Sequence, residues 1–283
     1  MNAPRRHMKG IALISVLWIV ALLTVVATGL SASVRFESRA VANLKLALQA
    51  QYAVESAVDL AALNLMYPQS IRWPVDGSVQ ELNIGDARVR IAIRDVTGKV
   101  DLNHAPMILL RNLLLQAEVD PQTADLLADA ILDWRDDDDF RHLNGAEDSD
   151  YRIAGLPYGA KDAPFHSVDE LQLVLGMTDE IFTAIQSSLT VFSGQGGVNV
   201  QHASPQVAAA AAGLEQLNIS ASGTAFTVHA EARVAGSIVS QAEATINITY
   251  SGVGRPFQIL QWRRPDERLF AEPNADGFQE AAL

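Results

Sequence analysis

The chain has 283 residues, no cysteine and a formal net charge of −12. It is long enough for more than one domain with a core, and the missing cysteines exclude disulfides and thiolate metal or redox sites. The negative charge argues against nucleic acid as a partner, because an acidic surface repels phosphate backbones.

A basic leader, residues 1–10, precedes an uncharged apolar run over residues 11–30. About 20 apolar residues in a helix cross a bilayer core of roughly 30 Å, whereas a secretory apolar region has only about 7–15. We therefore expect a retained single-pass transmembrane helix over 11–34, with a cytoplasmic N-terminus and the rest of the chain outside. Ordinary signal cleavage near 31–33 is the alternative, and the length of the run disfavours it.

The helix is predicted to continue well past this span. No glycine or proline occurs between Gly29 and Pro68, and apolar residues recur there at spacings near three and four. That pattern is typical of an amphipathic helix. The helix should end before Pro68, because the residue ahead of a proline disfavours the α region.

Alternating apolar and polar residues predict strands in two separate parts of the chain. These segments are 79–84, 87–95, 224–232, 237–250 and 257–262. Residues 35–98 and 196–264 are therefore expected to form an α+β domain, in which the long helix packs on an antiparallel sheet. The tail, 265–283, is polar.

Residues 99–195, between the two strand groups, are expected to form an inserted all-α domain. Helices are predicted at 105–117, 121–134, 168–175 and 179–189. Asp120 followed by Pro121 is a strong helix start, with an N-cap side chain and a proline at the first helical position. Ser167 and Glu170 have the spacing of a capping box.

A sequence repeat brackets this helical segment. The segments 98–106 and 196–204 align at a constant offset of 98 residues, with a glycine and a histidine at matching places. Each copy predicts a short extended piece, a polar cap and a helix. Chance similarity and a duplicated packing unit both remain open.

Residues 133–150 contain eight acidic residues and two arginines. Consecutive aspartates at a helix C-terminus repel one another and the helix dipole unless water or a cation compensates. Their hard oxygen donors suit calcium better than zinc. The spacing is not that of an EF-hand, because Arg141 stands where the sharp-turn glycine belongs. A solvated acidic loop and an irregular calcium site are both compatible with the composition.

No catalytic constellation is visible in the sequence. The histidines are scattered, and neither a Gly-x-Ser-x-Gly elbow nor a glycine-rich phosphate loop is present. His142 and His166 flank the acidic loop, and each is interpreted as a surface residue rather than a ligand. We therefore predict that the chain is not an enzyme.

The N-terminal pattern resembles that of type IV pilins and pseudopilins. A basic leader ends in Lys9-Gly10, and a long apolar helix that becomes amphipathic follows it. The resemblance implies that prepilin peptidase cuts after Gly10 and that the new amino terminus, Ile11, is methylated. Members of this family nearly all have glutamate at the fifth mature position, where this chain has Ser15. That departure is typical of the K-type minor pseudopilin of the type II secretion system (general secretion pathway protein K).

The resemblance to K-type pseudopilins implies a fold, a position and a set of partners. The fold is a pseudopilin domain with an inserted helical domain, whose units resemble SAM-like or helix-hairpin-helix modules. The subunit is expected to be anchored in the bacterial inner membrane, with a periplasmic head. Its expected position is the tip of the pseudopilus, where it initiates assembly and supports export of folded proteins. The partners are the I-, J- and H-type minor pseudopilins, the major pseudopilin, prepilin peptidase and the inner-membrane assembly platform.

The resemblance also favours a structural calcium ion in the acidic segment. The family pattern Asp-Trp-x-Asp-x-Asp, then Gly-Ala-Glu and a tyrosine, is matched from Asp133 to Tyr151. The candidate ligands are Asp133, Asp136, Asp138, Glu147 and Asp150.

Three other functions are compatible with parts of the sequence. They are a membrane-anchored calcium-dependent periplasmic hydrolase, a helix-hairpin-helix nucleic-acid module and a tip minor pilin of a type IV pilus. Mature N-terminal sequencing separates the pilin-like functions from the others.

Overall fold

A computed structural model describes residues 9–236, 238–249, 256–265 and 268–270. The predicted leader therefore lies outside the described residues except for Lys9 and Gly10, and so does most of the predicted tail. The fold is a mixture of helices and one large antiparallel sheet, as the sequence predicts.

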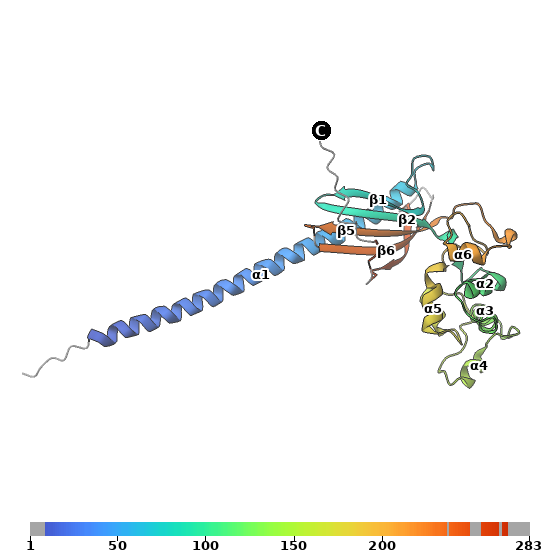
Figure 1. The fold of residues 1–283 in the computed structure, drawn as a ribbon, viewed down its shortest axis with the longest axis horizontal. Coiled ribbons are helices and arrows are strands. Elements are labelled where there is room, and N and C mark those ends of the chain that lie inside the picture. The colour runs from blue at the N-terminus through green and yellow to red at the C-terminus, as the bar shows by residue number, and fades with distance from the viewer. Residues whose placement is uncertain (1–8, 237, 250–255, 266–267, 271–283) are drawn as a thin grey trace, which may run out of the picture.

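The N-terminal helix α1 runs from Lys9 to Leu65 without interruption. At 1.5 Å per residue such a helix is roughly 85 Å long. Figure 1 shows it projecting far beyond the rest of the molecule, with only its C-terminal part against the sheet. Within the part of the chain that the structure describes, no helix is both long enough and apolar enough to span a membrane.

Five strands form the antiparallel sheet, in the order β1-β2-β5-β6-β7. They are β1 (Asp76–Ile84), β2 (Ala87–Asp95), β5 (Ala225–Val234), β6 (Ile238–Ile248) and β7 (Phe257–Arg263). The turn between β1 and β2 contains Gly85 at φ 57°, and the turn between β5 and β6 contains Gly236 at φ 75°. Glycine adopts such backbone angles without the steric cost that a Cβ brings.

The last turns of α1 pack on one face of this sheet. Small side chains at Ala50, Ala53, Ala57 and Ala61 are buried there, which lets the helix approach the strands closely. That face of the sheet supplies the buried apolar side chains of β2, β5 and β6. Because side chains alternate along a strand, the arginines of β2 are left on the face opposite α1.

The segment between β2 and β5 builds a second core of its own. Its helices are α2 (Met107–Gln116), α3 (Pro121–Arg135), α4 (Asp148–Ile153), α5 (Asp179–Ile185) and α6 (Pro205–Ala210). Its single-turn 3-10 elements include η1 (Val96–Gly98), η3 (Gln186–Ser188) and η4 (Glu215–Leu217). Asp120 caps α3 by accepting a hydrogen bond from the Thr123 N–H at 3.0 Å, which confirms the predicted helix start.

The structure corrects three details of the predicted insertion. It is not all-α, because β3 (Val100–Asp101) and β4 (Leu189–Thr190) pair in parallel. The expected helix 168–175 is the 3-10 element η2 (Val168–Leu173), and the Ser167 side chain makes no cap hydrogen bond. The segment that begins at 196 was assigned to the sheet domain, but α6 belongs to the second core.

Packing between α6 and α2 explains the last correction. The Asn112 side-chain amide donates to the Ala210 carbonyl at 3.0 Å, and Val207 is buried in the second core. The sequence repeat places the predicted boundary too early. The second copy of the repeat instead packs inside the helical segment.

Candidate metal centre

The acidic cluster lies where α3 ends and the chain turns towards α4. Asp133 is in the last turn of α3 and is fully buried. Beside it, the Trp134 ring stacks on Phe165 with centroids 6.2 Å apart and contacts Tyr151 at 5.9 Å. These buried rings fix the end of the helix, so the position of the Asp133 carboxylate is set by the hydrophobic core.

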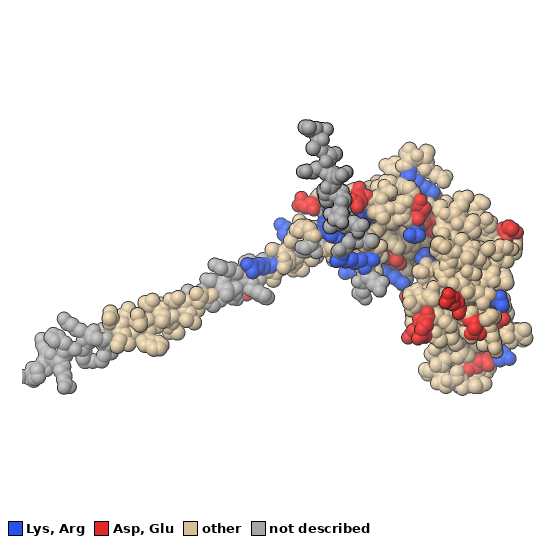
Figure 2. Space-filling model, in the orientation of Figure 1, with Lys and Arg blue, Asp and Glu red and all other residues tan. Residues whose placement is uncertain are grey.

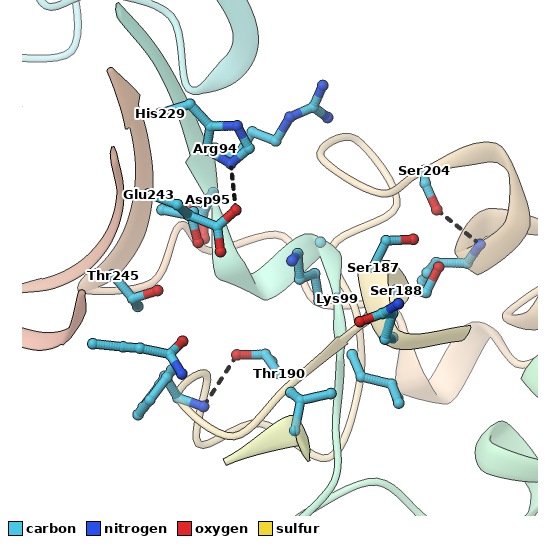
Figure 3. Close-up of a pocket in the computed structure, with 18 of the residues that line it drawn as sticks. Arg94, Asp95, Lys99, Ser187, Ser188, Thr190, Ser204, His229, Glu243 and Thr245 are labelled. Carbon is cyan, nitrogen blue, oxygen red and sulfur yellow. Dashed lines mark hydrogen bonds and ion pairs between the residues drawn. The ribbon is translucent and has the colours of Figure 1, made fainter. Parts of the chain in front are cut away.

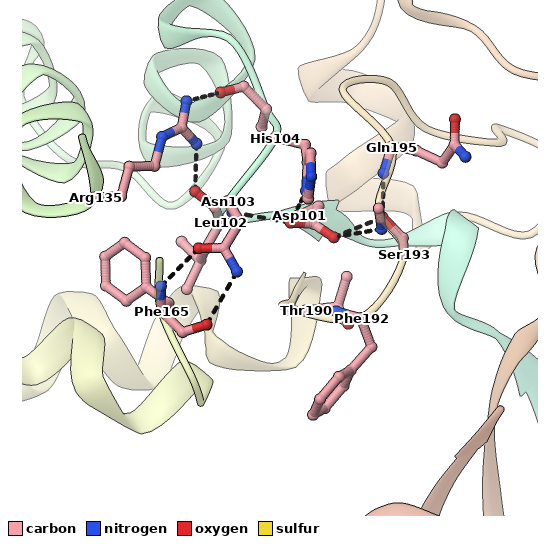
Figure 4. Close-up of polar contacts among 12 residues, drawn as sticks. Asp101, Leu102, Asn103, His104, Arg135, Phe165, Thr190, Phe192, Ser193 and Gln195 are labelled. Atoms are coloured by element: carbon pink, nitrogen blue, oxygen red, sulfur yellow. Dashed lines mark hydrogen bonds and ion pairs between the residues drawn. The ribbon is translucent and has the colours of Figure 1, made fainter. Parts of the chain in front are cut away.

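Polar contacts tie the same helix end to the segment that follows β3 (Figure 4). The Arg135 guanidinium donates to the carbonyls of Leu102 and Ala105, the latter at 2.8 Å. The Asn103 side chain donates to the Phe165 carbonyl at 3.0 Å and accepts from its N–H at 2.7 Å. The end of α3 is therefore held by residues thirty or more positions away in the sequence.

The two oxygens of Asp133 have different surroundings. Oδ1 accepts hydrogen bonds from the His142 backbone N–H, at 3.0 Å, and from the His142 ring nitrogen Nδ1. Oδ2 is buried and has no hydrogen-bond partner among the described residues. A Cβ at residue 145 would be 1.9 Å from Oδ2, so only a glycine fits there.

Two further carboxylates leave buried oxygens without a partner in the described residues, Asp136 at Oδ1 and Glu147 at Oε1. Burial raises the pKa of Glu147 to about 7, and the charges of Asp133 and Asp136 add to this effect. Burial, with Asp133 and Asp138 nearby, also raises the pKa of Asp136. Desolvated carboxylates that repel one another are a costly arrangement unless a cation or protons neutralise them.

The predicted ligands do not all converge. Among the described residues, Asp133, Asp136 and His142 can place one ligand atom each within 4.8 Å of one another. Asp138 accepts a hydrogen bond from the Phe140 N–H at 2.8 Å. Asp150 accepts from the Glu147 N–H at 3.0 Å and pairs with Arg141 at 3.1 Å, so its carboxylate is engaged in capping α4.

Two residues outside the predicted ligand set contribute to the site. His142 is exposed, as predicted, and its ring lies against Asp133, so that the pKa of the imidazole is raised, chiefly by that hydrogen bond. Asp162 lies beyond α4 at φ 52°, and its charge helps to raise the pKa of Glu147. Asp162 is fifteen residues from Glu147 in the sequence, so no local pattern indicates that the two carboxylates lie near each other.

The donor set fits a hard divalent cation. Within the described part of the chain, three buried carboxylate oxygens have no hydrogen-bond partner, and the ring nitrogen Nδ1 of His142 is already bonded to Asp133. Carboxylate oxygens of this kind are the ligands that calcium prefers.

Figure 2 shows several acidic side chains over the helical part of the molecule, whereas basic side chains gather near the junction of α1 and the sheet.

Comparisons with known proteins point to one family. Residues 87–194 match the family model for the first domain of type II secretion system protein K. The type II secretion system protein K of Aeromonas hydrophila is 27% identical over 64% of this chain and 62% of its own length. The protein K of Pseudomonas aeruginosa is 27% identical over 73% of this chain and 68% of its own. A putative protein K of Escherichia coli K12 is 26% identical over 62% and 59%.

A solved structure has the same fold. A chain of the GspK–GspI–GspJ complex from the enterotoxigenic Escherichia coli type 2 secretion system superposes with a TM-score of 0.60. The superposition covers 78% of this chain and 97% of the solved one, at 17% sequence identity. In sequence, this chain spans less than two thirds of the length of the Aeromonas and Escherichia relatives. On these matches, the chain is a relative of type II secretion system protein K.

Proposed function

We propose that the chain is a minor pseudopilin of a type II secretion system and acts as a structural and assembly subunit rather than as an enzyme. The observation that carries the proposal is the shared fold, which covers 97% of the matching chain in the GspK–GspI–GspJ complex of a type 2 secretion system. By this proposal the partners are the I- and J-type minor pseudopilins, together with the H-type and major pseudopilins, and the assembly starts at the filament tip.

The proposal places the N-terminal part of α1 in the inner membrane. Residues 13–26 carry no charge, and their large apolar side chains are 55% to 76% exposed in the isolated chain. Exposed apolar surface costs roughly 25 cal/mol per Å² in water, and a bilayer removes that cost. By the same proposal, α1 crosses the inner membrane once, and the rest of the chain forms a periplasmic head.

Processing at Gly10 tests the family-specific part of the proposal. Expression with its prepilin peptidase should give a mature chain that begins at methylated Ile11, and Gly10→Val should leave the leader attached. Mass spectrometry of the N-terminal peptide makes the measurement. An intact Met1 or a start near Val34 in the wild type would exclude prepilin processing.

Assembly is tested by complementation and co-purification. A strain that lacks its own K-type gene should regain secretion and surface pseudopili when it expresses this chain with its cognate I- and J-type subunits. Those subunits should co-purify with it. An epitope tag should label one end of each pseudopilus, because Ser15 supplies no carboxylate to pair with a preceding subunit's amine. Label along the shaft would contradict the tip position.

We further propose that the acidic cluster holds a structural calcium ion, with Asp133, Asp136 and Glu147 as the main ligands and Asp138 and Asp150 as further candidates. The unpartnered oxygens of the first three residues support this assignment. A ligand at 100 times its Kd stabilises a protein by about 2.7 kcal/mol, and each kcal/mol raises Tm by about 2–4 °C. Calcium should therefore raise Tm by several degrees relative to EGTA.

Variants separate this site from non-specific calcium binding. Asp133→Asn should abolish the calcium-dependent rise in Tm, while Asp86→Asn, in the exposed turn between β1 and β2, should retain it. Equal melting in calcium and EGTA for the wild type would remove the proposed ion without affecting the assembly proposal.

A further inference from the structure

A cavity of about 540 Å³ lies between the sheet and the second core, away from the acidic cluster. Side chains from β2, β5, β6 and β7 line one side of it, and residues around η3, β4 and α6 line the other (Figure 3). Its volume falls within the range of about 300–1,000 Å³ that is usual for small-molecule sites. The neighbouring helical segment thus encloses a space over the face of the sheet opposite α1.

Lys99 enters this cavity from a rigid part of the backbone. It follows η1, and its N–H donates to the Val96 carbonyl at 3.0 Å. The preceding residue, Gly98, packs so closely on the His202 backbone that a Cβ would meet the carbonyl oxygen at 2.3 Å. The lysine is therefore held at the junction of the two cores rather than on a mobile loop.

The carboxylates that line the cavity are already engaged. Asp95 accepts hydrogen bonds from the Thr97 N–H at 2.9 Å, the Thr97 hydroxyl at 2.7 Å and the Gly223 N–H at 3.2 Å. The Glu243 carboxylate lies 3.5 Å from the His229 ring nitrogen Nε2, although burial lowers the pKa of that imidazole. The Arg263 guanidinium, which also lines the cavity, pairs with Asp169.

Lys99 is left without an ion-pair partner among the described carboxylates. Burial lowers the pKa of its ammonium; Glu243 opposes this effect, and the like charges of Arg94 and Arg263 add to it. The Lys99 side chain is half-buried, and an ammonium that makes no direct ion pair there is incompletely solvated, because the interior does not replace all of its hydration. An anion in the cavity would supply a direct ion-pair partner.

Hydroxyl groups provide further donors in the same lining. Thr190 Oγ1 accepts from the Phe192 N–H at 3.1 Å, and Ser204 Oγ accepts from the Val207 N–H at 3.3 Å. Each hydroxyl therefore uses its oxygen within the protein and keeps its hydrogen for another acceptor. Ammonium and hydroxyl donors together suit the oxygens of a carboxylate or a phosphate group.

We propose that this cavity binds a small anion that carries a carboxylate or a phosphate group, with the Lys99 ammonium as its main anchor. Such a ligand sits between the sheet and the second core and contacts both. The site is independent of the calcium centre and of the assembly role.

Isothermal titration calorimetry on the full-length chain in detergent tests the proposal, with inorganic phosphate and succinate as separate probes in a buffer free of both groups. At least one probe should bind saturably, with a Kd below about 10 mM. Binding of one probe alone assigns the anion class. If neither probe gives saturable binding, the proposal is overturned.

Two lysine variants locate the binding. Lys99→Met should weaken the binding by at least about tenfold, which corresponds to about 1.4 kcal/mol. Lys45→Met, on the exposed part of α1, should bind as the wild type does. A loss of affinity of less than about tenfold in Lys99→Met overturns the assignment of Lys99 as the main anchor.

A third variant decides the matter if Lys99→Met does not fold. Ser187→Asp adds a carboxylate to the cavity lining and should pair with Lys99 in place of the ligand. It should keep the wild-type circular dichroism spectrum and lose probe binding. Binding equal to that of the wild type would show that the probe occupies another site.

Discussion

The backbone of His202 lies directly against Gly98, and the reciprocal contact exists between His104 and Gly196. A Cβ at residue 98 would be 2.3 Å from the His202 carbonyl oxygen, and one at residue 196 would be 3.1 Å from that of His104. The two glycines hold matching places in the sequence repeat, as do the two histidines. The two copies of the repeat therefore pack on each other through reciprocal contacts.

Gly98→Ala should destabilise the protein. The contacting atoms belong to the backbone, so neither side can move away cheaply, and overpacking of this kind costs about 1–3 kcal/mol. Urea unfolding followed by tryptophan fluorescence measures the change. Gly196→Ala is the matched control, because its Cβ would lie 3.1 Å from the His104 carbonyl oxygen, a close contact that a shift of a few tenths of an ångström relieves, and it should cost less than about 1 kcal/mol. Equal losses at the two positions would contradict the asymmetry of the contacts.

Gly145→Ala should abolish calcium binding while the rest of the second core stays folded. Its Cβ would be 1.9 Å from Asp133 Oδ2 and would push that oxygen out of the proposed site. We expect a loss of affinity of at least about tenfold, measured by calorimetry.

Gly155→Ala is the control for this prediction. Residue 155 has φ 79° and open space around it, so alanine there costs backbone strain of about 1 kcal/mol without touching a carboxylate. Calcium affinity should be unchanged. If both variants bound calcium like the wild type, Asp133 Oδ2 would not be a ligand.

The ion-free protein should become less stable as the pH rises from about 5 to about 7. The pKa of Glu147 is about 7 in the folded state and lies near 4.5 when the chain is unfolded. Between these values the folded state binds more protons than the unfolded state, so the free energy of unfolding falls with rising pH. The slope from this group is at most about 1.4 kcal/mol per pH unit.

Saturating calcium should abolish most of that slope, because the ion keeps the folded-state carboxylates deprotonated, as they already are in the unfolded chain above about pH 5. Urea unfolding at several pH values, with EGTA or with calcium, measures both slopes. Glu147→Gln in EGTA should lose most of the pH dependence. The same slope in this variant as in the wild type would assign the titration to another group.

Glu231→Gln should destabilise the protein strongly. Arg90 on β2 pairs with Glu231 on β5 at 3.1 Å, and both side chains are almost completely buried on the face of the sheet opposite α1. Removing one charge leaves the other buried without its partner, at a cost of about 3–5 kcal/mol. The double variant Arg90→Met with Glu231→Leu should recover most of the loss in chemical unfolding. No recovery would show that the pair contributes more than charge compensation.

Much of the fold could be predicted because its signals are local. The hairpin of β1 and β2 follows from alternation around a glycine turn, and the start of α3 follows from Asp120 and Pro121. The β3–β4 pair could not be predicted, because strands of two residues carry no periodicity. Their pairing, Val100 with Leu189, joins residues far apart in the chain.

The candidate site was predictable in composition but not in geometry. The sequence by itself determined a long N-terminal helix, an antiparallel sheet and an excess of carboxylates after Trp134, since these depend on neighbours along the chain. Only the tertiary structure decided that Asp133 meets Gly145 and His142, that Asp150 caps a helix, and that Lys99 lies in a cavity. Those contacts depend on how two cores pack, and burial, which sets their energies, exists only after the chain has folded.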